Sequence, residues 1–219
     1  MICLRKTAQK NCDRLNGKAR IAPYLADLLI VPWLLSEEHL FAYLCAKMIS
    51  LGIPVSLVVL ERRLGGHLAF LAEDELQAPF RAAAARVNLS YLMVSGALAI
   101  ISLSVAHRVF GHLPELDASF GEVVIWLVVG QSTAVLFGAS TLLMSSVGQR
   151  RLCDLIRIIT LLVFLCCVWI VGPRTGVLIA QMLAVAKITH AAVCAIFLAK
   201  YGVWPGLTAL FHKEIKIFS

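Results

Sequence analysis

Several polar side chains interrupt the long apolar stretches that make up most of this sequence. They are Asp27, Lys47, Gln131, Arg157, Lys187 and His190. An ionisable group in the middle of a membrane costs about 2.5–3.5 kcal/mol on insertion scales, so each one is a candidate functional residue. Lysine and histidine side chains can bind an anion, and a buried aspartate can take up a cation or a proton.

Asp27 lies near the middle of the first apolar stretch, and Lys187 lies near the middle of the last, three positions before His190. Two interpretations follow. In the first, Asp27 and Lys187 lie at the same depth and form a buried structural pair. In the second, Lys187 faces a cavity and binds an anion, while Asp27 takes up H⁺ or Na⁺ as an ion-coupling carboxylate. Lys47 is another cation that would meet an anionic substrate in such a cavity.

Two further side chains have structural explanations. Arg157 lies one turn from the end of its stretch, so it can reach the membrane surface, and Asp154 lies three positions away on the same helical face. Gln131 belongs to a stretch whose small residues share one face, which is typical of close helix packing in lipid. Gln131 either contributes a hydrogen bond to that packing or lines a cavity with Lys47, Lys187 and His190.

The elements that position these residues are transmembrane helices. Apolar residues make up 60% of the chain, charged residues make up 15%, and the mean hydropathy is +0.85. In soluble proteins about 45–50% of the residues are apolar and about 25% are charged. We therefore predict an all-α integral membrane protein with a six-helix bundle over residues 21–200, between a basic cytoplasmic tail (1–20) and a second cytoplasmic tail (201–219). The expected spans are 21–36, 40–60, 88–110, 120–146, 153–172 and 177–200.

Lysine and arginine alternate between the connections of these spans. One set of tails and loops carries 15 of them, and the other set carries two. Because the basic side of a membrane protein is cytoplasmic, both chain ends are predicted to lie in the cytoplasm. The alternation also requires the weak stretch 21–36 to cross, although it would reach only about 24 Å of a hydrocarbon core about 30 Å thick. Pro23 and Pro32 predict that this helix is distorted.

Two local features carry their own predictions. Gly52 and Pro54 predict a kink in the second span. The cytoplasmic loop at 61–87 contains a segment, 71–80, whose mixture of apolar and charged residues fits either a short helix lying on the membrane surface or a plain connector.

Other classes of function lack their signals in the sequence. The net charge of +7 is explained by the basic loops beside the spans, so no nucleic-acid partner is predicted. There is no Gly-x-Ser-x-Gly elbow, His-Glu-x-x-His site or Gly-rich phosphate loop, so no enzyme activity is predicted. The seven cysteines show no CxxC or Cys/His ligand spacing, so no metal site or other cofactor is expected beyond possible coupling to H⁺ or Na⁺.

The order of several short motifs resembles a known family. Asp27 precedes a short turn, Tyr43 and Lys47 open the next helix, and Phe110-Gly111 follows a cytoplasmic loop. Later come Leu143-Met144-Ser-Ser-Val-Gly148-Gln-Arg-Arg151 and Gly172-Pro-Arg-Thr-Gly176-Val-Leu-Ile179-Ala180. Together they resemble the C-terminal half of the polysaccharide and lipid-linked oligosaccharide flippases of the multidrug/oligosaccharidyl-lipid/polysaccharide exporter superfamily.

This resemblance implies one lobe of a twelve-helix transporter, whose substrate cavity lies between two six-helix bundles. The chain would then be a half that pairs with a second half or with another copy, a fragment, or a truncated remnant. The implied function is translocation of an undecaprenyl-diphosphate-linked glycan across the bacterial cytoplasmic (inner) membrane by alternating access. The alternatives are a multidrug or ion-coupled efflux half of the same superfamily, and a non-transporting membrane subunit.

Overall fold

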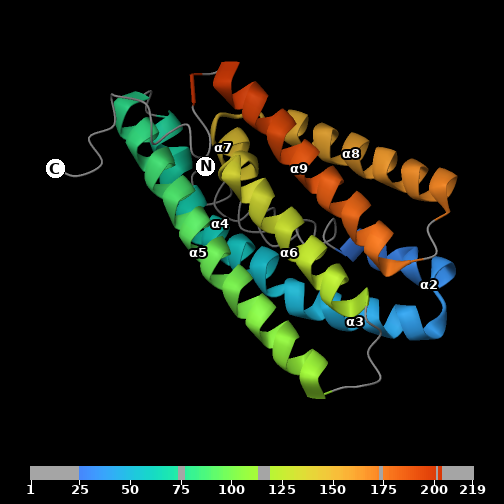
Figure 1. Ribbon diagram of the computed structural model, residues 1–219. Coiled ribbons are helices and arrows are strands. Elements are labelled where there is room, and N and C mark those ends of the chain that lie inside the picture. The colour runs from blue at the N-terminus through green and yellow to red at the C-terminus, as the bar shows by residue number, and fades with distance from the viewer. Residues whose placement is uncertain (1–24, 74–76, 113–118, 173–174, 201, 204–219) are drawn as a thin grey trace, which may run out of the picture.

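The computed structural model of the chain describes residues 25–73, 77–112, 119–172, 175–200 and 202–203. Every regular element in these ranges is a helix (Figure 1). The first elements are η1 (Ala26–Leu29), α2 (Val31–Leu34), α3 (Glu37–Ser50) and α4 (Gly52–Glu73). They are followed by α5 (Gln77–His112), α6 (Ser119–Leu136), α7 (Ser140–Ser146), α8 (Arg150–Val171) and α9 (Gly176–Lys200).

Five helical segments are long and apolar enough to cross a membrane. They are Glu37–Ala72, Pro79–Val109, Ser119–Ser146, Arg150–Val171 and Gly176–Lys200. Each contains or overlaps one of the five clear predicted spans, so that part of the prediction is confirmed. Large apolar side chains such as Ile158, Leu162 and Trp169 on α8 are exposed on the outside of the bundle. Long apolar helices with apolar outer faces are the features of a multi-pass membrane protein.

The predicted first span, 21–36, has a different form from the others. Its described part contains only the 3₁₀ turn η1 and the single-turn helix α2, which meet at Ile30. Pro32 lies in the first turn of α2, where its missing N–H group breaks no helical hydrogen bond. The predicted distortion therefore takes the form of two short helical pieces, and residues 21–24 lie outside the described part of the chain.

The second span is divided at Leu51 into α3 and α4, where Gly52 and Pro54 predict a kink. Pro54 has no backbone N–H group to donate. The next residue, Val55, donates its backbone N–H to the Leu51 carbonyl at 3.2 Å, and the helix continues from there. α4 then continues to Glu73, and α5 begins at Gln77. Segment 71–80 is thus divided between the ends of two long helices, so a separate surface helix was the wrong prediction; residues 74–76 lie outside the described ranges.

α6 occupies the centre of the bundle, with α9, α5 and α3 packed around it (Figure 1). Its buried residues include Phe120, Val124 and Leu127, and α8 packs on the far side of α9. α6 and α9 approach each other closely at Gly130, where an added Cβ would lie 2.5 Å from Ala184 Cβ and 2.6 Å from Ala184 Cα. The small-residue face predicted from the sequence therefore allows two central helices to touch.

Replacing Gly130 by alanine should destabilise the protein. The new methyl group would meet the backbone of Ala184, which cannot move without moving α9, and overpacking of this kind costs about 1–3 kcal/mol. Gly121→Ala is the matched control, because a Cβ there has nothing within 4 Å and lies on the same helix. The thermal unfolding midpoint in detergent should fall for Gly130→Ala and stay level or rise for Gly121→Ala; equal midpoints would contradict this account of the α6–α9 contact.

Candidate functional site

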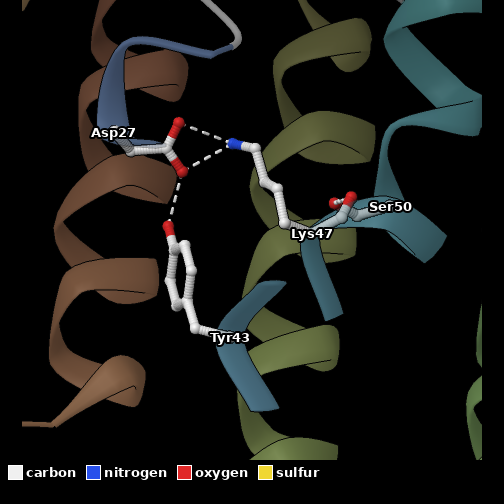
Figure 2. A network of polar contacts seen from close by, with 4 residues as sticks. All are labelled: Asp27, Tyr43, Lys47 and Ser50. Atoms are coloured by element: carbon white, nitrogen blue, oxygen red, sulfur yellow. Dashed lines mark hydrogen bonds and ion pairs between the residues drawn. The ribbon is translucent and has the colours of Figure 1, made fainter. Parts of the chain in front are cut away.

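The carboxylate of Asp27 is held in a closed polar network between η1 and α3 (Figure 2). Lys47 Nζ lies 2.8 Å from Asp27 Oδ1 and 2.7 Å from Oδ2, and the Tyr43 hydroxyl donates a hydrogen bond to Oδ2 at 2.5 Å. Tyr43 and Lys47 are one turn apart on α3, so both side chains face η1. On the side of Lys47 away from Asp27, Ser50 Oγ donates a hydrogen bond to the Lys47 carbonyl at 2.9 Å (Figure 2).

This network corrects the expected pairing of Asp27 with Lys187. Asp27 and Lys47 are 0% and 1% exposed, and the ion pair that Asp27 makes is with Lys47. The pair joins the short first segment to α3, which explains how two helical fragments stay packed against the bundle although Leu29 and Trp33 are exposed. Lys47, which the sequence placed among the substrate-cavity candidates, uses its charge to hold Asp27 in place.

A cavity of about 150 Å³ lies elsewhere in the bundle, between α4, α5, α6, α7, α8 and α9. Apolar side chains such as Leu57, Phe164 and Leu183 form much of its wall. Its charged and larger polar lining residues are Glu61, Tyr91, Gln131, Arg157, Lys187 and His190. Three of the four predicted cavity residues, Gln131, Lys187 and His190, are therefore brought together, whereas Lys47 and Asp27 are not in the wall.

One wall of the cavity is a break in the fourth span. α6 ends at Leu136, α7 begins at Ser140, and Gly138 between them has a φ of 80°, which a side chain would disfavour. Asn88 Oδ1 on α5 accepts a hydrogen bond from the freed Ala139 N–H at 2.9 Å. The small residues of this span were predicted from the sequence only to form a packing face, so the break at Gly138 was missed. Irregular backbone at membrane depth is tolerated where it is buried in protein or lines a cavity, and both conditions hold here.

Gln131 shows that this cavity has unused hydrogen-bonding capacity. The residue is only 4% exposed, and neither its side-chain oxygen nor its side-chain nitrogen has a hydrogen-bond partner among the described residues. Buried amide groups in proteins are almost always satisfied by protein, water or ligand. Of the two interpretations of Gln131, the structure favours the cavity-lining one.

Three residues that line the cavity were not assigned to it from the sequence: Arg157, Glu61 and Tyr91. Arg157 was predicted to be a structural residue beside Asp154, and its Nη1 does lie 3.5 Å from Asp154 Oδ1. The same arginine also reaches the cavity, together with Thr160 and Phe164. The spacing of these three residues on one face of α8 is the sequence signal that could have placed Arg157 at the site.

A third group of polar side chains joins α8 to α9. The sulfur atoms of Cys153 and Cys194 and a ring nitrogen of His190 all lie within 4.8 Å of one another. His190 and Cys194 are one turn apart on α9, but Cys153 comes from α8, so the spacing rules that argued against a metal site could not detect the group. His190 thus belongs both to this group and to the cavity wall.

The arrangement suits the binding of an anionic group. Arg157, Lys187 and His190 offer donors from two helices, Gln131 adds an amide, and the apolar surroundings strengthen electrostatic attraction. Glu61 offsets part of the positive charge.

Compared with known proteins, the chain matches no family model, no curated protein and no solved structure.

Proposed function

We propose that this chain is half of a flippase-like transporter that moves an undecaprenyl-diphosphate-linked glycan across the bacterial cytoplasmic membrane by alternating access. The observation that carries the proposal is the set of nitrogen-bearing side chains, Arg157, Lys187 and His190, around one cavity in an apolar bundle. Such groups are expensive in a membrane and are typical of substrate pathways. A discontinuous helix at the same cavity is a recurrent feature of transporter binding sites.

The chemistry of the cavity favours a phosphate-bearing substrate. Guanidinium and ammonium groups bind phosphate oxygens by charge-assisted hydrogen bonds, and the Gln131 amide can donate another. A cavity of about 150 Å³ has room for several water molecules. That space fits a phosphate group, so the glycan and the lipid tail of the substrate would lie outside it, in the space between two halves.

A second half would cover the outer faces of this bundle. Large apolar side chains are exposed along α5 and α8, including Met93, Ile100, Ile158 and Trp169. They are suited to contact with lipid or with another apolar helical bundle. The resemblance to twelve-helix flippases favours a second six-helix half or a second copy of this chain as the partner.

The predicted orientation puts the cavity on the cytoplasmic side. Both chain ends are predicted to be cytoplasmic, so α8 begins and α9 ends on that side. Arg157 lies near the start of α8, and His190 lies in the second half of α9. The substrate headgroup would therefore enter from the cytoplasmic half of the membrane.

Ion-coupled multidrug efflux fits the geometry less well. That function would use Asp27 as the coupling carboxylate, but Asp27 is bonded to Lys47 and Tyr43 and does not line the cavity. H⁺ or Na⁺ coupling at Asp27 would have to break this network in each cycle. The flippase function requires no such step.

Transport by reconstituted protein tests the proposal. Liposomes containing the chain, alone and with a separately expressed second half, would be loaded with a fluorescent polyprenyl-diphosphate glycan, and movement between leaflets would be followed by quenching from outside. Translocation above protein-free liposomes supports the flippase function. Transport of cationic dyes in place of the glycan would instead support efflux, and failure to move either substrate in both preparations would contradict transport.

A further inference from the structure

Cys153, His190 and Cys194 form a compact cluster, called here the thiol–imidazole cluster, between α8 and α9. Cys194 Sγ lies 3.7 Å from His190 Nε2, and the three potential ligand atoms all lie within 4.8 Å of one another. Cys153 and Cys194 are 1% and 0% exposed, so both sulfur atoms lie inside the protein. The cluster is positioned by helix packing, because His190 and Cys194 are one turn apart on α9 and face Cys153 on the neighbouring helix.

From this geometry we infer that the thiol–imidazole cluster binds one zinc ion. In tetrahedral zinc sites the metal lies about 2.3 Å from sulfur and about 2.0–2.1 Å from nitrogen, so the ligand atoms are roughly 3.5–3.8 Å apart. The spacing of the cluster needs only a small contraction to reach this arrangement. Thiolate and imidazole ligands select thiophilic metals, whereas Mg²⁺ and Ca²⁺ require oxygen ligands.

Charge balance favours a divalent ion. Each thiol releases its proton to solvent when the metal binds, so two thiolates and Zn²⁺ form a neutral unit with no redox step. A neutral unit is suited to the interior of a membrane bundle, where an uncompensated charge is costly. A monovalent ion such as Cu⁺ would leave a net negative charge on the same two thiolates.

The position of His190 brings the cluster next to the cavity. His190 lies in the cavity wall as well as in the cluster, and three protein ligands leave the fourth position of a tetrahedral zinc ion open. Three protein ligands and one water or substrate oxygen is the usual arrangement where zinc does more than stabilise a fold. The inference rests on the cluster alone and does not depend on the proposed transport function.

Metal binding by the purified, reduced chain tests the inference. The chain would be stripped with a chelator in detergent and titrated with Co²⁺ and then with Zn²⁺, with the thiolate-to-cobalt absorption as the signal. We expect one Zn²⁺ per chain, and Cys153→Ser and Cys194→Ser should each weaken binding by at least about a hundredfold, because loss of a partner outside the ligand set already costs about 10–100-fold. The matched control is the double substitution Cys166→Ser/Cys167→Ser, which changes two exposed thiols on the same helix and should leave the affinity unchanged.

A second measurement uses the unaltered chain, in case a serine variant fails to fold. Zn²⁺ should slow the alkylation of Cys153 and Cys194, mapped by mass spectrometry, and leave the rates at Cys45, Cys166 and Cys167 unchanged. Absence of bound metal, binding that survives in both serine variants, or equal protection of these five described cysteines would overturn the inference. So would recovery of Cys153 and Cys194 as a disulfide that reduction cannot convert into a metal-binding form.

Discussion

Replacing Lys47 by methionine should lower the free energy of unfolding by about 3–5 kcal/mol, because it leaves the charge of Asp27 buried without its ion-pair partner. Asp27→Asn should have a similar effect by leaving the ammonium group of Lys47 buried. In the double variant Asp27→Asn/Lys47→Met neither charge remains, and most of the stability should return. Unfolding by SDS in mixed micelles, followed by tryptophan fluorescence, measures all three differences.

Asp154→Asn is the matched control for this experiment. Asp154 also pairs with basic side chains, Arg150 at 3.8 Å and Arg157 at 3.5 Å, but it is 50% exposed. Loss of a pair in such a position should cost about 0–1 kcal/mol. The network described here would be contradicted if Lys47→Met lowered the free energy of unfolding by less than about 1 kcal/mol and a larger decrease appeared only when Lys187 was also replaced. That result would show that Lys187 is the ion-pair partner of Asp27.

Replacing Lys187 by methionine should weaken binding of a polyprenyl diphosphate by roughly ten- to a hundredfold. A hydrogen bond to a charged group contributes about 1.5–3 kcal/mol, and each 1.4 kcal/mol is a factor of ten in affinity. Methionine keeps most of the length of the unbranched lysine side chain but lacks the ammonium group, so it removes the charge and its hydrogen-bond donors. Lys200→Met is the control on the same helix, because Lys200 is exposed at the end of α9 and does not line the cavity.

Microscale thermophoresis of the purified chain with a short-chain polyprenyl diphosphate gives both affinities. Equal affinity for the wild type and Lys187→Met would exclude Lys187 from the anion site, whatever the transport assay shows. Weaker binding in both Lys187→Met and Lys200→Met would point to general attraction of a basic protein for an anionic lipid.

The sequence was sufficient to predict the all-helical membrane class and five of the spans, because runs of about 20 apolar residues carry that information locally. Pro54 and Gly52 likewise identified the division between α3 and α4. The extension of α4 to Glu73 and of α5 back to Gln77 was missed, since charged residues ended the apolar runs although the helices themselves continue.

The candidate site was predicted only in part, because its remaining members depend on contacts between distant helices. Gln131, Lys187 and His190 could be identified by their polarity within apolar spans. The partner of Asp27 was assigned by depth alone, although the one-turn spacing of Tyr43 and Lys47 carried the local signal for the true network. Cys153 lies some 40 residues before Cys194 in the sequence, so only packing of α8 on α9 brings the two together.

The break at Gly138 shows why a pattern can support two structures. Small residues from Gly130 onwards fit both a continuous packing face and a helix that opens at one glycine. The choice depends on Asn88, whose side chain accepts the hydrogen bond of the freed Ala139 N–H from another helix. That contact joins residues 51 positions apart, and no periodicity in the fourth span could reveal it.

The cavity at the broken fourth span is proposed to recognise an anionic headgroup. The most direct test of this proposal is the difference in affinity of the purified chain for a polyprenyl diphosphate and for the neutral polyprenol with the same chain length. We expect the diphosphate to bind at least about tenfold more tightly, which corresponds to about 1.4 kcal/mol, and Lys187→Met to remove most of this preference. Equal affinity of the wild-type chain for the two lipids would contradict the proposal.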